Sequence, residues 1–524
     1  MDNLKKYFCI EIIDKDEYKK RLEEEIKLLE EMDFLWFIKR VVEIFNNHIK
    51  KYPSLLRGSG GCSLLLYYLG INQIDPIKYS IPLSRFINKL RVGMPDIDFD
   101  IPSSIKNQLF EDILLSNKDT IRMTSDVNKN NNEFFDDLIK EDPTIALVHN
   151  SALIIYSKKQ ENIILNNKIT ETQIKLTKNN IQEYNLCKID LLGNSALDQL
   201  YCIDKTKKIT DYFFKDEQLF KFIIKDDGIG ITHAETPKIQ NVIKILKPSN
   251  IKQLSICLAI VRPFANYIIN DNINWINIKN EIIYDDDFIL YLVKKLNYNF
   301  DKADEIRRLF KSKSDKFKID EFINYIDLSE LKLEEKTKLK NILNKLPKYS
   351  FCKAHSINYA RMVYCLYWNK FYNKKEFWIT TIKNIKGYYK DWVYIRKGLD
   401  NGLNFKGIEN CNSFYHYLYT GYWLNKNFMT RCYLTNTNAI EQNIIEKTEH
   451  IEYEFRGLIA GTSNTNNTNN NCQMIITIGY DNNKFINLHL NKNRDLSKYK
   501  QVMGKGYLIN AITPYIVIRN ILLL

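Results

Sequence analysis

The sequence lacks several patterns that assign a chain to a familiar class of protein. Its ten cysteines are scattered, with no Cys-x-x-Cys pair and no pairing with histidine that is typical of zinc ligands. Its glycines match neither Gly-x-x-x-x-Gly-Lys-Ser/Thr nor Gly-x-Gly-x-x-Gly. No signal peptide is visible, and no uninterrupted apolar run is long enough to span a bilayer. We therefore expect reduced cysteines, a cytoplasmic location and no membrane contact, and we reject a P-loop and a dinucleotide-binding fingerprint.

The composition is that of a large soluble protein with a basic balance. The chain has 524 residues, of which 45% are hydrophobic and 27% charged, enough for several domains with sizeable cores. Lysine and arginine number 76 against 63 aspartate and glutamate, which gives a formal net charge of +13. Aromatic residues reach 13% and offer stacking surfaces among the lysines. A polyanion partner fits this balance, although many basic chains bind none.

One stretch, from Arg57 to Asp100, carries the chemistry. It opens on a glycine- and serine-rich turn and closes on Met94-Pro95-Asp96-Ile97-Asp98-Phe99-Asp100. Because strand side chains alternate between faces, the three aspartates share one face and the two apolar residues take the other. A further carboxylate, Asp190, lies within the apolar-flanked segment Lys188 to Gly193.

These pieces suit phosphoryl transfer. Carboxylates from two strands can hold two divalent ions, which at about 3.5–4 Å apart stabilise both the attacking and the leaving oxygen. A Gly-Ser turn lets backbone N–H groups approach a phosphate, and the helix that should follow adds its positive end. A lone Asp-x-Asp is usually a solvated strand face, and a lone Gly-Ser-Gly is usually a loop. Together and in this order, they favour a nucleotidyltransferase palm.

The same stretch resembles the catalytic core of the family C polymerases, the bacterial DNA polymerase III alpha subunits. Those proteins carry a Gly-Arg-Gly-Ser-x-x-Gly-Ser turn, then Ile-Thr-x-x-Asp-Pro, then Met-Pro-Asp-x-Asp-x-Asp. The similar segments here are Arg57 to Ser63, Gly70 to Pro76 and Met94 to Asp100. Lys188 to Gly193 resembles the Lys-Phe-Asp-Phe-Leu-Gly of that family.

Further similar blocks follow in the family's order, so the resemblance covers roughly residues 15–380. Ala303 to Lys311 resembles Ala-Asp-x-Leu-Arg-Arg-Ala-Met-Gly-Lys, and Phe351 to Ala360 resembles Phe-Asn-Lys-Ser-His-x-x-x-Tyr-Ala. Two departures stand out. Tyr284 to Asp287 reads Tyr-Asp-Asp-Asp where the family has Tyr-Gln-Glu-Gln, and Phe310 precedes Lys311 directly where the family has Met-Gly. They bear on fine geometry and speed more than on the reaction.

The resemblance implies roles for particular residues. Asp96, Asp98 and Asp190 would be catalytic and would hold two Mg²⁺ ions, with Mn²⁺ as another suitable metal. The implied nucleotide-binding residues are Arg57, Gly58, Ser59, Arg307, Arg308, Lys353, His355 and Tyr359.

Some of these residues have structural alternatives. Neighbours on a helix point about 100° apart, so one of Arg307 and Arg308 could reach a triphosphate while the other pairs within the protein. Without the resemblance, a solvated basic helix would explain both. For Tyr359 the alternative is core packing.

The predicted fold is α+β and multidomain, with a nucleotidyltransferase-type (polymerase beta-like) palm, helical fingers, a reduced thumb and a C-terminal OB-like β-barrel. Two helices are expected within residues 15–50, interrupted near residues 32–34. Family members usually begin with a histidine-rich PHP domain, but the first histidine here is His48, so we expect no PHP-type metal centre. The predicted divisions are N-terminal helices with the first palm segment (1–105), a reduced thumb (106–144), the second palm segment (145–193), fingers (194–385), a helical, helix-hairpin-helix-like DNA-binding region (386–450) and an OB-like domain (451–524).

We therefore predict a DNA-directed DNA polymerase that extends a primer with dNTPs by two-metal-ion nucleotidyl transfer. Primer–template DNA and dNTPs are the expected partners, with a sliding clamp or other replication proteins as further ones. Two alternatives stay open. A catalytically weak, polymerase-derived DNA-binding or scaffold protein would explain the altered fingers motifs. A distributive or template-independent nucleotidyltransferase would explain the small thumb.

Overall fold

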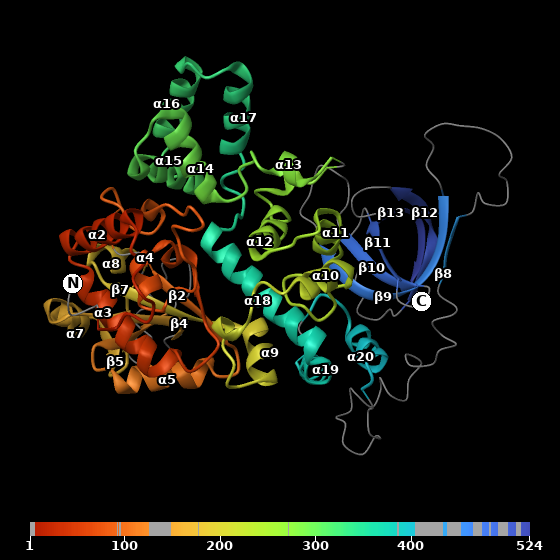
Figure 1. The fold of residues 1–524 in the computed structure, drawn as a ribbon, viewed down its shortest axis with the longest axis horizontal. Helices are drawn as coiled ribbons and strands as arrows, with labels where there is room; N and C mark the ends of the chain where they lie inside the picture. Colours follow the sequence, from red (N-terminus) through yellow and green to blue (C-terminus); the bar gives the residue numbers. More distant parts are fainter. Residues whose placement is uncertain are drawn as a thin grey trace, which may run out of the picture. The chain divides into compact units, whose positions relative to one another are not determined.

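A computed structural model describes residues 6–91, 93, 96–124, 148–176, 178–270, 272–384, 387–403, 433–436, 452–464, 474–480, 484–490, 501–509 and 515–523. The chain separates into two compact units, and both strands and helices are abundant, which confirms the α+β class (Figure 1). Unit 1 comprises Met1–Asp216, Ser249–Ile268 and Ile278–Cys365. Unit 2 comprises Glu217–Pro248, Ile269–Asn277 and Leu366–Leu524.

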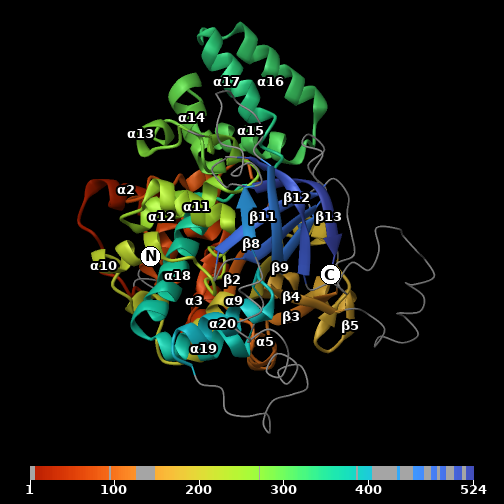
Figure 2. The same ribbon diagram turned by 90° about the vertical axis from the view of Figure 1, so that its right-hand side faces the viewer.

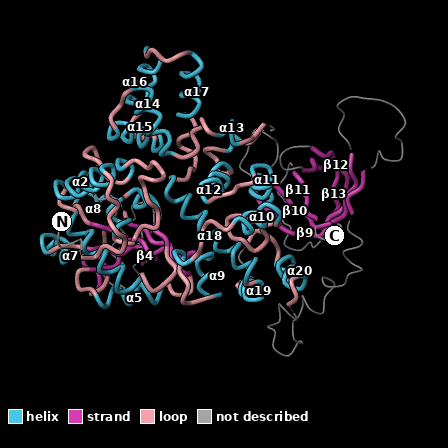
Figure 3. The backbone as a smooth tube through the Cα atoms, in the orientation of Figure 1, coloured by secondary structure: helices cyan, strands magenta, loops and turns pink. Residues whose placement is uncertain are grey.

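The centre of unit 1 is a mixed seven-stranded sheet with the order β1-β2-β7-β4-β3-β6-β5. Its strand β4 is labelled in Figure 3, where strands are magenta. Strands β2 and β7 run parallel, and β1 and β4 flank them antiparallel. The strands are β1 (Leu55–Arg57), β2 (Ile97–Pro102), β3 (Thr120–Thr124), β4 (Val148–Ile155), β5 (Lys168–Thr170), β6 (Gln173–Ile174) and β7 (Cys187–Asn194).

The two faces of β2 differ as the alternation predicts. Ile97 and Phe99 are buried, and the Phe99 ring stacks on Phe45 with centroids 5.8 Å apart. Asp98 and Asp100 take the opposite face. An apolar face therefore anchors the strand and leaves its carboxylates on the other side.

The two helices predicted within residues 15–50 are confirmed as α2 (Asp16–Glu31) and α3 (Leu35–Ile44), and Asp33 between them has a left-handed φ of 56°. Helix α18 (Lys353–Tyr372) runs from residues of unit 1 into residues of unit 2. The other helices formed mainly by unit 1 residues are α4 (Leu64–Tyr68), α5 (Lys106–Ser116), α7 (Glu161–Asn166), α8 (Lys178–Glu183), α9 (Ser195–Ile203), α12 (Ile251–Ile260), α14 (Asp285–Leu296), α15 (Phe300–Ser312), α16 (Lys316–Leu328) and α17 (Leu333–Leu343).

Helices α7 and α8 pack on the far half of the sheet. Ile164 of α7 and Ile181 of α8 belong to one apolar cluster with Ile154 and Ala152 of β4. Ala152 stands opposite Asp190 in the β4–β7 pairing. The apolar cluster therefore extends as far as the strand neighbour of Asp190.

The segment predicted as a reduced thumb, 106–144, begins with α5 and β3. Strand β3 pairs with β4 and β6 inside the sheet of unit 1. The rest of that segment lies outside the described residues.

In unit 2, β9 pairs with both β10 and β12, so β9, β10, β11, β13 and β12 form a closed ring (Figure 2). The β11–β13 pair is parallel and the other pairs are antiparallel. The strands are β8 (Tyr433–Asn436), β9 (Glu452–Asn464), β10 (Met474–Tyr480), β11 (Lys484–Leu490), β12 (Gln501–Ile509) and β13 (Tyr515–Leu523).

The helices formed mainly by unit 2 residues are α10 (Glu217–Lys225), α11 (Pro237–Leu246), α13 (Trp275–Ile278), α19 (Lys374–Lys383) and α20 (Asp391–Asp400). Of the helix-hairpin-helix-like region predicted at 386–450, the structure describes only 387–403 and 433–436. Among the helices in the described ranges, none combines the length and apolar character needed to cross a membrane.

The start of α18 packs tightly on the glycine-rich turn Gly58–Cys62. A Cβ added at Gly61 would lie 2.5 Å from the Cβ of Ala354, closer than two carbons can approach. The Cys352 thiol donates to the Gly58 carbonyl oxygen at 3.1 Å, and the Asn358 side-chain amide donates to the Leu56 carbonyl oxygen at 2.9 Å. This contact fixes the turn against the helix.

We expect Gly61→Ala to lower the stability of unit 1 by about 1–3 kcal/mol, because the added methyl overpacks this contact. Thermal melting would show the loss. Adding Ala354→Gly should recover some of it, since that change removes the opposing methyl. A Gly61→Ala protein that melts at the wild-type temperature would show that the contact is looser than described.

Candidate active site

Strand pairing brings the predicted metal ligands together. In the parallel β2–β7 register, Asp98 stands opposite Asp190, and Asp96 lies just before β2. One carboxylate oxygen from each of the three residues lies within 4.8 Å of the other two. The Oδ1 atoms of Asp98 and Asp190 are buried and accept no hydrogen bond from the described residues. Hard oxygen ligands with unused lone pairs are the donors that Mg²⁺ prefers, so the residues present fit such an ion.

The electrostatics of this cluster call for a cation. Burial, followed by the charges of Asp190 and Asp96, raises the pKa of Asp98 to about 7. Lys188 partly offsets this repulsion, because its Nζ lies 2.7 Å from Asp190 and 3.2 Å from Asp96. Sequence reasoning missed this role for Lys188. Its position two residues before Asp190, on the same face of a strand, was the available signal.

The glycine-rich turn adjoins the carboxylates. Gly58 has φ +65°, and a Cβ built on it would lie 3.7 Å from Oδ2 of Asp98. Arg57 stands opposite Asp98 in the β1–β2 register, and its Nη1 lies 3.6 Å from Oδ1 of Asp100. Ser59 follows Gly58 in the same turn. The predicted phosphate cradle and the predicted metal ligands are therefore neighbours.

Helix α18 contributes Tyr359 and His355 to the same region. The Tyr359 hydroxyl donates to Oδ2 of Asp100 at 3.0 Å, and the rings of His355 and Tyr359 lie 4.1 Å apart. Both side chains are buried. Burial raises the pKa of Asp100, while Arg57 and Tyr359 oppose the rise. Tyr359 is thus a packed residue whose hydroxyl orders the carboxylate strand.

The two adjacent arginines of α15 differ in exposure but share one partner. Arg307 is buried, donates from Nε to Asp304 Oδ1 at 2.9 Å, and places Nη1 3.4 Å from Asp285 Oδ2. The Arg308 side chain is 35% exposed and donates from Nε to Oδ2 of Asp304 at 3.0 Å. Both arginines therefore pair with Asp304, and Arg308 is the more exposed of the two.

The Tyr284–Asp287 departure builds a buried charge network that sequence reasoning did not foresee. Oδ2 of Asp285 lies 2.7 Å from Lys311, 3.4 Å from Arg307 and 3.6 Å from Arg85. Burial alone would raise the pKa of Asp285, but these cations outweigh it and lower the pKa to about 2. Burial and the charge of Asp285 raise the pKa of Asp286 to about 6.

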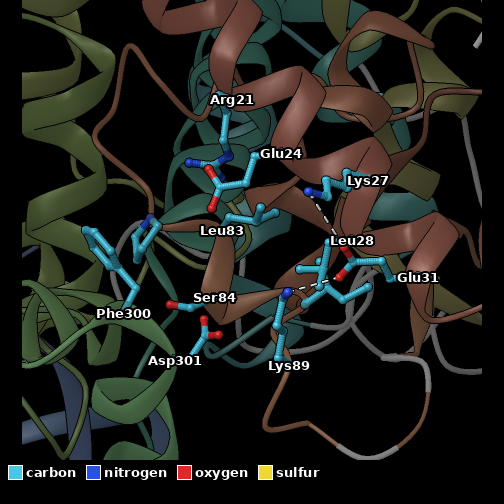
Figure 4. Close-up of a pocket in the computed structure, with 12 residues that line it drawn as sticks. Arg21, Glu24, Lys27, Leu28, Glu31, Leu83, Ser84, Lys89, Phe300 and Asp301 are labelled. Carbon is cyan, nitrogen blue, oxygen red and sulfur yellow. Dashed lines mark ion pairs between the residues drawn. The ribbon is translucent and has the colours of Figure 1, made fainter.

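A hollow of about 310 Å³ lies elsewhere in unit 1, against α2 and the start of α15 (Figure 4). Arg21, Glu24, Leu83, Phe300 and Asp301 help to line it, and its lining includes none of the predicted site residues. Arg21 also donates to the carbonyl oxygen of Cys62 at 2.9 Å. Arg21 therefore both lines the hollow and bonds to the glycine-rich turn, but the hollow is separate from the carboxylate site.

Comparison with known families agrees with this geometry. The family described as "Bacterial DNA polymerase III alpha NTPase domain" matches residues 2–116, which include the glycine-rich turn and two of the carboxylates. The "Bacterial DNA polymerase III alpha subunit finger domain" matches residues 194–326, which include both α15 arginines. Both matches are to parts of bacterial DNA polymerase III alpha subunits, which this chain resembles over these two ranges.

The individual proteins that the chain resembles are distant in sequence. DNA polymerase III subunit alpha of Thermotoga maritima is 27% identical over 404 residues, covering 69% of this chain and 46% of the relative. The Mycoplasma genitalium protein of the same name is 24% identical, covering 68% of this chain and 51% of its own. DNA polymerase III subunit alpha of Mycoplasma pneumoniae is 23% identical, and the match covers 76% of this chain and 55% of that protein. The chain spans about half the length of the curated proteins it matches.

We expect Tyr359→Phe to destabilise the protein by about 1–3 kcal/mol, because the buried Asp100 loses a hydrogen-bond donor. Thermal melting would measure the change. Tyr349→Phe is the matched control, because that residue is 52% exposed and a surface hydroxyl costs little to remove. Equal melting temperatures for the two variants would contradict the role assigned to the Tyr359 hydroxyl.

Proposed function

We propose that this protein is a DNA-directed DNA polymerase that extends a primer with dNTPs. The observation that carries the proposal is the convergence of Asp96, Asp98 and Asp190 beside the glycine-rich turn, in a chain that resembles DNA polymerase III alpha subunits. Carboxylates from adjacent strands next to a phosphate cradle are the elements that nucleotidyl transfer requires.

In this proposal, Asp96, Asp98 and Asp190 would hold two Mg²⁺ ions, or Mn²⁺ in their place. Such ions, when bound, activate the primer hydroxyl and stabilise charge on the triphosphate. Lys188 keeps the carboxylates close together by pairing with two of them. Asp100 is fixed by Tyr359 and Arg57, which holds β2 in place beneath the reacting groups.

The nucleotide would bind between the turn and the fingers helices. Backbone N–H groups of Gly58 and Ser59 would cradle phosphate oxygens, with Arg57 beside them. Arg308 and Lys353 would add positive charge, and Arg307 would hold Arg308 in place through their shared partner Asp304. The wall of the pocket would be formed by His355 and Tyr359.

The predicted domains fit a DNA substrate. The five-stranded ring of unit 2, with its parallel β11–β13 pair, supports an OB-like domain at 451–524 that would hold single-stranded template. The divisions at 1–105, 106–144, 145–193, 194–385 and 386–450 are likewise proposals, as are a sliding clamp as partner and a cytoplasmic location.

A distributive nucleotidyltransferase is the second candidate. Strand β3 belongs to the sheet of unit 1, which leaves few residues for a duplex-gripping thumb. Product length on a long primed template separates the two candidates. Long products from a single binding event support a processive polymerase, and single additions support the distributive nucleotidyltransferase.

Asp98→Ala should lower the rate of primer extension by about a thousandfold or more, because several kcal/mol of charge stabilisation is lost. Labelled primer–template, dNTPs and Mg²⁺ would provide the assay, and a gel-shift measurement should show unchanged DNA affinity. Chelation of the metal should stop primer extension by the wild type as well. Extension by Asp98→Ala at the wild-type rate would refute the metal assignment.

The two α15 arginines should respond differently to truncation. Arg308→Ala should raise the KM for dNTP about tenfold with little loss of stability, because a charge-assisted phosphate contact disappears. Arg307→Ala should instead cost about 3 kcal/mol of stability, because two buried aspartates each lose one of their cationic partners. Steady-state kinetics and thermal melting of both variants test this, and the reverse pattern would show that Arg307 is the phosphate ligand.

A further inference from the structure

Lys353, the first residue of α18, has a carboxylate beside its ammonium group. Its Nζ lies 3.7 Å from Oδ1 of Asp287, and its side chain is 13% exposed against 21% for that of Asp287. Within the described ranges, this is the one ion pair that Lys353 makes. The distance is long for a hydrogen bond, so the contact is mainly electrostatic.

Asp287 uses its two oxygens differently. Oδ2 accepts hydrogen bonds from the backbone N–H groups of Tyr284, at 3.1 Å, and Ile283, at 3.2 Å, and so caps the start of α14. Oδ1 faces Lys353. The capping bonds fix the carboxylate in place, which means that its charge stays next to Lys353 whatever the lysine does.

The surroundings of Lys353 place it at the glycine-rich turn. The preceding residue, Cys352, donates to the carbonyl oxygen of Gly58, and the following residue, Ala354, touches Gly61. Its own backbone N–H donates to Asp286 at 2.5 Å, which holds the start of the helix. The lysine is therefore anchored on both sides, and only its side chain can change partner.

We propose that Asp287 is a resident counter-ion of Lys353, and that an incoming triphosphate replaces it as the partner of this lysine. The inference rests on the proposed function in naming the ligand a nucleoside triphosphate. Asp287 is then a positioning residue that weakens substrate binding: it keeps Lys353 paired in the empty pocket and repels the phosphates that arrive. In this proposal Asp287 affects the KM for the triphosphate, while the metal-binding carboxylates affect kcat.

Asp287→Asn tests this, because asparagine has the same shape and its carbonyl oxygen can keep the cap. We expect the KM for dNTP to fall about two- to fivefold, the factor that a partly exposed ion pair is worth, with kcat little changed. The affinity for inorganic tripolyphosphate with Mg²⁺, measured by calorimetry, should rise by the same factor. Glu330→Gln, which removes one charge from an exposed loop residue, is the matched control and should change neither value.

A double-mutant cycle isolates the pair. Lys353→Gln should weaken tripolyphosphate binding, and in that background Asp287→Asn should give a smaller gain than in the wild type. Because Lys353→Gln leaves the cap intact, it remains informative if Asp287→Asn folds poorly. A purely structural Asp287 would instead give a higher KM, a lower kcat and a lower melting temperature.

The outcomes separate this inference from the proposed function. If the wild type extends no primer, the polymerase proposal falls, while the tripolyphosphate affinities still decide the counter-ion role. If the wild type extends primers but Asp287→Asn leaves both KM and tripolyphosphate affinity unchanged, the counter-ion role is refuted and the polymerase stands. The counter-ion role would also be refuted if Asp287→Asn raised the tripolyphosphate affinity equally in the wild type and in Lys353→Gln.

Discussion

The pairing of β2 with β7 is the constraint on which the candidate site depends. A parallel register that sets Asp98 opposite Asp190 places two carboxylates side by side, and no local turn could do so for residues so distant in the sequence. The apolar residues on the other face of β2 fix that register, because a slip by one residue would turn the carboxylates into the core. The stacking of Phe99 on Phe45 therefore contributes to the position of charges that it never touches.

A second layer of charges surrounds the first. Lys188 and Arg57 balance the carboxylates of the sheet, while Asp285 and Asp304 balance the basic residues of α15. Each of these buried charges has an opposite neighbour, as low-dielectric surroundings require. The three clustered carboxylates, with Lys188 as their lysine partner, keep an excess of negative charge that a bound cation would balance.

The sequence predicted the features of this arrangement that depend on short-range pattern. Alternation predicted the faces of β2, and helical periodicity predicted α2 and α3. Arg307 and Arg308 both donate to Asp304, so the division of roles predicted for them stays a prediction. Alternation along one strand does not show that Asp190 joins Asp98. That grouping came from the order of the motifs and from the family resemblance.

The remainder depends on contacts between distant segments. Nothing local to Tyr284–Asp287 shows that Arg85, some two hundred residues earlier, approaches Asp285. Nor does the spacing of the sequence show that Lys188 bridges two carboxylates, or that β3 joins the central sheet rather than a thumb. These features follow from tertiary packing, which the pattern of residue types along the chain does not reveal.

The burial of Asp285 and Asp304 has a consequence for behaviour in salt. Mobile ions screen charges that face water over about 10 Å at 0.1 M ionic strength, but they do not enter a sealed interior. Both aspartates and Arg307 are buried, so the ion pairs between them lie beyond the reach of added electrolyte. Rising ionic strength would release a polyanion from surface lysines long before it loosened α15 from α14.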